Sequence, residues 1–181
     1  MPIQIGGKPL ADFTQPIRVL YDCHGRIERF LVALLTVSRS RGGEALDERH
    51  RSGVSAALHY FEQGAPLHTA DEEVSLFPRL RSSTANEAAG IGKCLSELEV
   101  EHREKGRGHQ TVHRLATSWL EESTLSMEDA QTLRDELERL ELIYGRHIRT
   151  EEDRVFPLAA QVLTREDLRA IASEMKARRQ R

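Results

Sequence analysis

The sequence contains the stretch His68-Thr69-Ala70-Asp71-Glu72-Glu73-Val74-Ser75-Leu76-Phe77-Pro78, and the same pattern returns nearer the C-terminus. The second copy reads His147-Ile148-Arg149-Thr150-Glu151-Glu152-Asp153-Arg154-Val155-Phe156-Pro157. Both copies carry a histidine, two adjacent glutamates, a phenylalanine and a proline at matched positions. A single His-x-x-x-Glu is common by chance, but five matched positions that occur twice in 181 residues indicate a duplicated site.

The spacing between the histidine and the first glutamate fits an α-helix. At about 100° per residue, four residues return to within about 40° of the starting direction, one turn further along the axis. We therefore expect His68 and Glu72 to project from one face of a helix. In the second copy, His147 and Glu151 have the same spacing and should do the same.

The remaining positions of the repeat are predicted to face elsewhere. Glu73 and Glu152 lie about 140° around the helix from their histidines, so we assign them to solvent or to ion pairs between helices. Phe77 and Phe156 fit an apolar layer beneath the site. The proline that follows each phenylalanine is expected to end or bend its helix.

Two further histidines, His24 and His102, stand outside the repeats, one ahead of each copy. Each half of the chain thus supplies one helix with a single histidine and one helix with His-x-x-x-Glu. In an antiparallel bundle these helices would direct four imidazoles and two carboxylates toward one point, as metal-binding bundles do. Imidazole suits iron, zinc and copper, and a carboxylate can bridge two ions. Burial of the two ionised carboxylates without a metal would be costly, so the pattern predicts a metal site.

The chain as a whole predicts an all-α protein. Its composition of 39% hydrophobic and 30% charged residues is typical of a globular domain, and no stretch alternates as a β-strand does. Apolar residues recur at helical spacing instead. The expected helices span about 17–37, about 44–80 with a kink at Gly64-Ala65-Pro66, Thr84 or Asn86 to about 120, Ser126 to about 156, and a short fifth from Thr164.

Long helices joined by short connections favour an antiparallel up-down four-helix bundle. We assign residues 1–14 to an N-terminal arm, residues 15–162 to the bundle, and residues 163–181 to a short C-terminal helix and a basic tail. The tail runs from Lys176 to Arg181. We expect it to aid solubility and to complement the negative end of the last helix dipole rather than to bind a polyanion.

The bulk properties argue against several functional classes. A net charge of −3 gives no reason to expect nucleic acid as a partner, and no apolar stretch of about 18 residues could span a membrane. Cys23 and Cys94 form neither a disulfide framework nor a paired zinc motif, so reduced thiols are expected. The N-terminus has no charged segment followed by an apolar run, so we predict no signal peptide and expect a soluble cytoplasmic protein.

These segments resemble hemerythrin-like (HHE cation-binding) domains. The resemblance covers roughly residues 15–160 and rests on the two repeats together with Asp22-Cys23-His24 and Glu101-His102-Arg103. It implies two non-haem irons joined by an oxo or hydroxo bridge, although zinc can occupy the same ligands. The implied terminal ligands are His24, His68, His102 and His147. The implied bridging carboxylates are Glu72 and Glu151.

The third helix departs from the oxygen-carrying hemerythrins, which place a His-x-x-x-His pair there. Four residues after His102 the chain has Gly106, and four residues before it has Leu98. One iron is therefore expected to lack a nitrogen ligand or to take an extra carboxylate or water, which argues against reversible oxygen carriage. His109 and His113 lie on the face of His102, but His109 is about 10 Å further along. They join the site only if the glycines distort that helix, and are otherwise core or channel histidines.

Three further residues stand close in sequence to the implied ligands. Tyr21 and Tyr144 each precede an implied ligand by three residues. They are candidates to donate hydrogen bonds to the ligands, and equally candidates for ordinary core tyrosines. Cys23 points about 100° away from His24, so we expect a packed thiol rather than a ligand.

The leading functional hypothesis is a binding or sensory module that takes up oxygen, nitric oxide or a related redox ligand at the metals. Any signal would then pass through a protein partner or the surface of a homodimer. Two alternatives stay open: an enzyme that reduces nitric oxide or peroxide or repairs iron centres, and an iron storage or delivery protein. A sensor binds gas reversibly, an enzyme consumes oxidant with an electron donor, and a delivery protein loses iron readily to a chelator.

Overall fold

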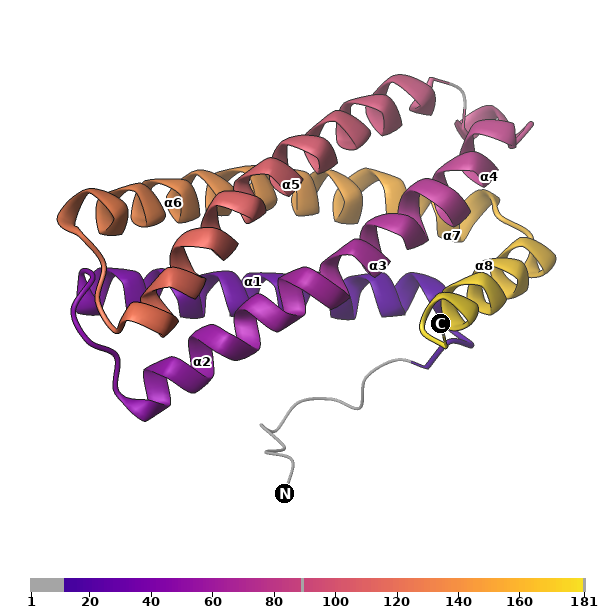
Figure 1. The fold of residues 1–181 in the computed structure, drawn as a ribbon. Helices are drawn as coiled ribbons and strands as arrows, with labels where there is room; N and C mark the ends of the chain where they lie inside the picture. Colours follow the sequence, from indigo (N-terminus) through magenta and orange to yellow (C-terminus); the bar gives the residue numbers. More distant parts are fainter. Residues whose placement is uncertain (1–11, 89, 181) are drawn as a thin grey trace.

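The computed structural model describes residues 12–88 and 90–180, and every regular element in these ranges is a helix. Four helical rods run antiparallel, and a short helix packs at one end of them (Figure 1). This arrangement confirms the predicted all-α bundle. Most of the predicted N-terminal arm, residues 1–11, lies outside the described residues. Within the described ranges, no helix is long and apolar enough to cross a membrane.

Each rod is one long helix or several helical segments in line. The first rod is α1 (Pro16–Arg41). The second rod consists of α2 (Glu48–His59), α3 (Ala65–Ala70) and α4 (Phe77–Ser82), which are joined by the π-helical turns η1 (Tyr60–Gly64) and η2 (Asp71–Leu76). The 3-10 turn η3 (Asn86–Ala88) precedes the third rod, which is α5 (Ile91–Glu122). The fourth rod consists of α6 (Met127–Thr150), the π-helical turn η4 (Glu151–Val155) and α7 (Phe156–Val162). The short helix at the end of the bundle is α8 (Arg165–Arg178).

Side-chain caps explain where three of the helices begin. The Ser126 hydroxyl accepts a hydrogen bond of 3.0 Å from the backbone N–H of Asp129 at the start of α6. Thr164 begins α8 with a reciprocal capping box, and both caps lie at predicted positions. The second rod begins later than predicted. Asp47 caps α2 by accepting a backbone N–H in its first turn, so this rod starts directly after Asp47 rather than near Glu44.

The start of the third rod was predicted wrongly. Gly90, and not Thr84 or Asn86, occupies the N-cap position of α5, with a φ of +82°. This left-handed conformation suits glycine and separates α5 from the preceding 3-10 turn. Once started, α5 continues unbroken to Glu122, so Gly92, Gly106 and Gly108 do not interrupt it.

Both repeat segments contain a π-helical turn. In η2 the N–H of Phe77 bonds to the carbonyl of Glu72, five residues earlier, and in η4 Phe156 bonds in the same way to Glu151. The proline after each phenylalanine has no N–H, and its ring crowds the carbonyl four residues before it, which favours the wider turn. The third π-helical turn, η1, ends at the predicted kink, Gly64-Ala65-Pro66. The prolines therefore reshape the turns that carry the glutamates, and the rods continue beyond them.

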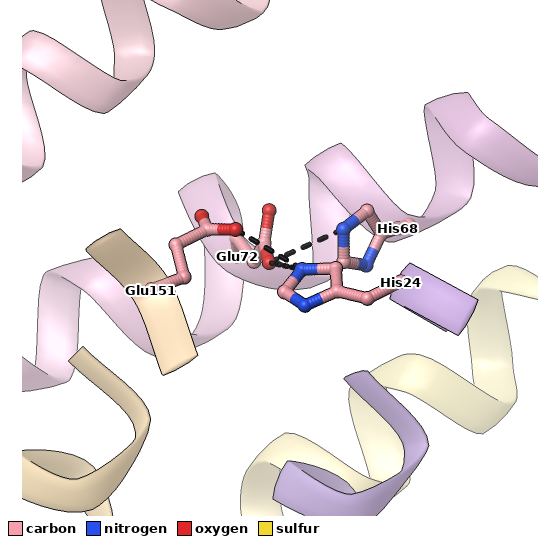
Figure 2. A group of neighbouring side chains, drawn as sticks. All are labelled: His24, His68, Glu72 and Glu151. Atoms are coloured by element: carbon pink, nitrogen blue, oxygen red, sulfur yellow. Dashed lines mark ion pairs between the residues drawn. The ribbon is translucent and has the colours of Figure 1, made fainter. Parts of the chain in front are cut away.

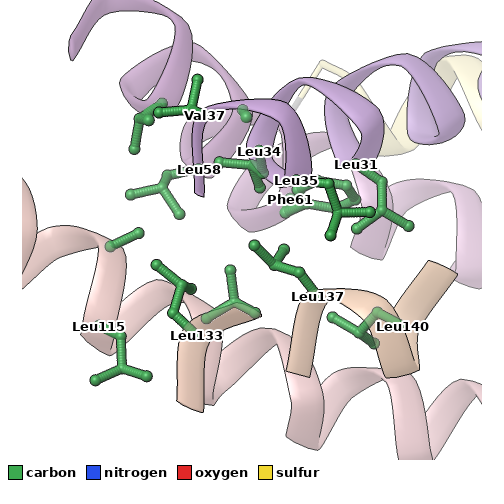
Figure 3. Packing of buried hydrophobic residues seen from close by; sticks show 14 of the residues in the cluster. Leu31, Leu34, Leu35, Val37, Leu58, Phe61, Leu115, Leu133, Leu137 and Leu140 are labelled. Carbon is green, nitrogen blue, oxygen red and sulfur yellow. The ribbon is translucent and has the colours of Figure 1, made fainter. Parts of the chain in front are cut away.

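The apolar core is divided into two clusters. The larger one lies among α1, α2, α5 and α6 and includes Leu34, Leu35 and Leu137, which Figure 3 shows facing one another. The smaller one surrounds Phe77 and Phe156, each 0% exposed, which confirms the predicted apolar layer. Burial of such side chains contributes about 1.5–3 kcal/mol each.

The loop between α1 and α2 requires a glycine at position 43. Its φ is +94°, and a Cβ there would lie 2.9 Å from Ala130 Cβ and 3.2 Å from the Leu125 carbonyl oxygen. Gly43→Ala should therefore lower the free energy of unfolding by about 1–3 kcal/mol, measured by chemical denaturation. Gly53→Ala is the matched control, because a Cβ at Gly53 in α2 meets nothing within 4 Å. That variant should gain up to about 1 kcal/mol from helix propensity; a Gly43→Ala protein as stable as the parent would contradict the argument.

Helix α8 is fastened to the bundle by a buried ion-pair network. The Asp71 carboxylate is 0% exposed and accepts hydrogen bonds from Arg178 at 2.7 Å and Arg179 at 2.6 Å. Ile171 and Met175 of α8 are fully buried in the smaller core cluster. The basic tail was expected to aid solubility and to complement the helix end. Lys176 and Arg178 do lie in the last turn of α8, and Arg178 and Arg179 also compensate a buried carboxylate on the turn that carries Glu72.

Candidate metal centre

The six residues predicted as metal ligands converge from all four rods. Their elements, in chain order, are α1 for His24, α3 for His68, η2 for Glu72, α5 for His102, α6 for His147 and η4 for Glu151. All six are buried, and both glutamates are 0% exposed. In Figure 2 four of them, His24, His68, Glu72 and Glu151, point toward one another.

The six side chains form two groups that share both glutamates. His24 and His68 with Glu72 and Glu151 make one group, and His102 and His147 with the same two glutamates make the other. Within each group, one potential ligand atom per residue lies within 4.8 Å of the others. The cluster can therefore hold metal, and its two halves each offer two imidazoles and two carboxylates.

The glutamates are oriented as bridges. One oxygen of Glu72 lies 3.4 Å from His68 Nε2, and its other oxygen lies 3.3 Å from His102 Nε2. Glu151 has one oxygen 3.1 Å from His24 Nε2 and the other 3.2 Å from His147 Nε2. Each carboxylate thus directs one oxygen to a histidine of each pair. The two histidines of the first pair are also close to each other, since the ring centroids of His24 and His68 are 4.9 Å apart.

Three outer glutamates hold the histidines in this orientation. Nδ1 of His24 is 2.8 Å from the Glu152 carboxylate, and Nδ1 of His102 is 2.7 Å from the Glu73 carboxylate. Nδ1 of His147 is 2.8 Å from the Glu101 carboxylate. A carboxylate at Nδ1 favours the tautomer with the proton on Nδ1, which leaves Nε2 with a lone pair for a metal.

The sequence predicts that Glu73 and Glu152 face solvent or form ion pairs between helices. They do reach another helix, but each meets a histidine of the other repeat half rather than a lysine or arginine. Glu101 was noticed only as the neighbour of His102. The signal that could have found these contacts is the adjacency itself, because a residue next to an inward-facing ligand points sideways, toward the neighbouring helix.

Among the described residues, the Glu72 and Glu151 carboxylates pair with histidine nitrogens and with no arginine or lysine. None of the four carboxylate oxygens of Glu72 and Glu151 has a hydrogen-bond partner among the described residues. Burial, and then the neighbouring Glu151 carboxylate, raise the pKa of Glu72 well above its usual value. Burial likewise lowers the pKa of His68 well below its usual value, which favours the neutral imidazole that metals bind. Buried carboxylates that face imidazole nitrogens are the arrangement that cations stabilise.

The other residues that the sequence singled out lie outside this cluster. The Tyr21 hydroxyl donates to the Glu152 carbonyl at 3.4 Å, and the Tyr144 hydroxyl is 2.8 Å from His109 Nε2, so neither tyrosine bonds to an implied ligand. His109 also stacks on a phenylalanine, and burial lowers its pKa to about 4. His113 is exposed, so the unbroken α5 keeps both histidines out of the two groups. Cys23 is buried and packed, as expected.

A buried lysine near the centre was not predicted from the sequence. Lys105 is 5% exposed, and its Nζ stands over the Tyr144 ring, 4.6 Å from the ring centroid. Burial lowers its pKa to about 8, although the Glu151 and Glu72 carboxylates act in the opposite direction. Lysines are rarely buried in soluble proteins. The available signal was its position, because a residue three places after His102 lies on nearly the same face of the helix.

A family comparison agrees with this geometry. The model for the family described as "Hemerythrin HHE cation binding domain" matches residues 15–159, nearly all of the four rods. The chain belongs to the hemerythrin family. This hemerythrin-family chain is also 32% identical over 171 residues to a protein of Haemophilus influenzae (strain ATCC 51907 / DSM 11121 / KW20 / Rd) that carries the description "Uncharacterized protein". The match spans 94% of this chain and 93% of that protein.

Family membership and geometry agree on the coarse chemistry. The name of the matched family is that of a cation-binding domain, and the chain has a buried His/Glu cluster able to hold metal. The oxygen-carrier pair on the third helix is absent from the cluster, because Gly106 stands four residues after His102. The centre instead has a symmetric donor set, with two histidines on each side of two shared carboxylates.

Proposed function

We propose that this protein binds two non-haem irons and uses them to bind or sense oxygen, nitric oxide or a related redox ligand. His24 and His68 would hold one iron, His102 and His147 the other, and Glu72 and Glu151 would lie between them. The observation that carries the proposal is the pair of overlapping four-residue groups that share both glutamates. Two groups built around shared, buried carboxylates call for two cations rather than one.

The donor set supports iron and leaves room for a ligand. Imidazole and carboxylate donors with open coordination positions are typical of non-haem iron sites. Iron there would supply a redox-active Lewis acid to which a small diatomic molecule can bind. With two imidazoles and two carboxylates on each side, neither ion is fully surrounded by the protein.

The chain's own residues would set the properties of this centre. The outer carboxylates of Glu73, Glu101 and Glu152 hold three of the histidines at Nδ1, while Nδ1 of His68 has no such partner. Hydrogen-bonded carboxylates make imidazole a better donor, so the iron at His102 and His147 would have two strengthened donors and the other only one. This inequality favours ligand binding or redox change at one iron over the other.

The proposed function is tested by gas binding to the iron-loaded protein. Reversible spectral changes with oxygen or nitric oxide, without turnover, are the expected result. Steady consumption of nitric oxide or peroxide in the presence of an electron donor would instead favour an enzyme. Rapid loss of iron to a weak chelator, with no ligand-dependent spectrum, would contradict binding or sensing and favour storage or delivery.

Removal of the outer carboxylates should weaken metal binding while the fold stays intact. We expect the double variant Glu73→Gln/Glu152→Gln to bind metal about 10- to 100-fold more weakly, because His102 and His24 lose the partners that orient them. Competition with a chromogenic chelator measures the affinity, and circular dichroism checks the fold. Glu138→Gln, at an exposed glutamate that pairs with Arg39, is the control and should bind metal as the parent does. Equal affinities in all three proteins would count against the assigned roles.

A further inference from the structure

A cavity of about 610 Å³ lies beside the proposed metal centre, between the second rod and α5. Its lining includes the buried residues His102, Lys105 and Tyr144, and also exposed residues such as Val74 and Gln110, so it connects the centre with the surface. A single water occupies about 30 Å³ in the liquid, so a diatomic ligand would fill a small fraction of this space. The cavity volume is in the range of sites for organic molecules.

Most of the cavity wall is apolar. Leu58, Phe61, Ala65 and Val112 line it from the two sides, and each is at most 9% exposed to solvent. Val74, also in the lining, is 62% exposed and is one of the few large hydrophobic side chains that face solvent. An apolar channel with an apolar rim favours a ligand with a hydrocarbon portion over one that is polar throughout.

Lys105 adds a charge that the protein leaves unmatched. Its ammonium nitrogen contacts the face of the Tyr144 ring and has no ion-pair partner among the described residues. Of the outer carboxylates around it, Glu101 is engaged by His147, and Glu73 lines the cavity but is engaged by His102. Glu72 and Glu151 influence Lys105 electrostatically, and bound metals would neutralise both. An ammonium group has three N–H donors, and a buried one normally has an anionic acceptor.

We propose that this cavity binds an organic carboxylate with an apolar chain. The carboxylate accepts hydrogen bonds from Lys105, and the chain lies along Leu58, Phe61 and Val112 toward the opening. The inference rests on the proposed function in one respect: metals at Glu72 and Glu151 free the Lys105 charge for an external anion. It adds a second ligand class, next to the metals, to the diatomic ligand of the centre itself.

Isothermal titration calorimetry of the iron-loaded protein with octanoate tests the proposal. Octan-1-ol, which has the same chain without the charge, and inorganic phosphate, which has charge without a chain, are titrated in parallel. Octanoate should bind at least about 10-fold more tightly than either, since a hydrogen bond to a charged group is worth about a factor of ten or more. Equal binding of octanoate and octan-1-ol, or of octanoate and phosphate, would overturn the proposal.

A matched pair of variants assigns the charge. Lys105→Met keeps an unbranched apolar side chain without the ammonium group and should weaken octanoate binding roughly 10- to 100-fold. Lys93→Met removes an exposed lysine from the same helix, where it pairs with Glu97, and should leave the affinity unchanged. Unchanged affinity in Lys105→Met would overturn the proposal. Metal content is measured on each sample, so a protein that holds two irons and ignores octanoate overturns the carboxylate site alone. A protein without metal overturns the proposed function, and the carboxylate site with it.

Discussion

Replacement of both Arg178 and Arg179 by glutamine should lower the free energy of unfolding by about 3–5 kcal/mol. The two guanidinium groups are the partners of the Asp71 carboxylate, at 2.7 Å and 2.6 Å, and Asp71 is 0% exposed. Loss of both would leave a buried charge without compensation, which is among the most destabilising single events in a folded protein. Chemical denaturation followed by circular dichroism measures the effect.

Two comparisons show whether the buried charge is the cause. Adding Asp71→Asn to the double variant removes the charge that was left unpaired, so a substantial part of the stability should return. Lys176→Gln, at an exposed lysine of the same helix, should change stability by less than about 0.5 kcal/mol. A double variant as stable as the parent would show that α8 is held by its apolar contacts alone. Because Asp71 precedes Glu72 in η2, we also expect the double variant to bind metal more weakly.

The second large effect concerns the bridging carboxylates. In the variant Glu72→Leu/Glu151→Leu we expect metal content to fall to near zero, because both four-residue groups lose their shared members. The metal-free variant should nevertheless be more stable than the metal-free parent, by about 1–4 kcal/mol. The reason is that two buried carboxylates without hydrogen-bond partners are replaced by apolar side chains of similar volume. Metal analysis and denaturation of the chelator-treated proteins measure the two quantities.

Opposite changes in metal binding and in metal-free stability distinguish a metal site from a structural polar cluster. If the carboxylates stabilised the fold directly, the same variant would be destabilised as well. Glu138→Leu, at an exposed glutamate outside the centre, controls for the general effect of adding a leucine. A leucine variant that keeps its metal would contradict the assignment of Glu72 and Glu151.

The repeat in the sequence was sufficient to predict which side chains meet, because helix geometry alone puts His68 with Glu72 and His147 with Glu151. The pairing of these helices with those of His24 and His102 followed from bundle topology. All six side chains are indeed brought together in the structure. Their role as metal ligands stays a prediction until metal is measured.

What the sequence did not reveal depends on contacts between rods. Periodicity along one helix says which way Glu73 and Asp71 point, but not that the first meets His102 and the second meets two arginines more than a hundred residues away. Lys105 was missed for a related reason. A lysine is usually assigned to the surface, and only the three-dimensional packing of α5 against the ring of Tyr144 shows that it is enclosed.

Backbone details also escaped the sequence argument. Prolines after Phe77 and Phe156 were expected to end or bend the helices, whereas each follows a π-helical turn that carries a glutamate. The missing N–H and the proline ring favour that outcome, but a regular kink would satisfy the same constraints.

X-ray absorption spectroscopy at the iron edge of the iron-loaded protein tests the central claim most directly, since it reports metal neighbours as well as ligand atoms. Two irons that share both carboxylates should give a metal–metal distance of about 3.5–4 Å, with nitrogen and oxygen as the only nearest neighbours. Chemical analysis of the same sample should find two irons per chain. A single iron per chain, with no second metal within this distance, would contradict the account.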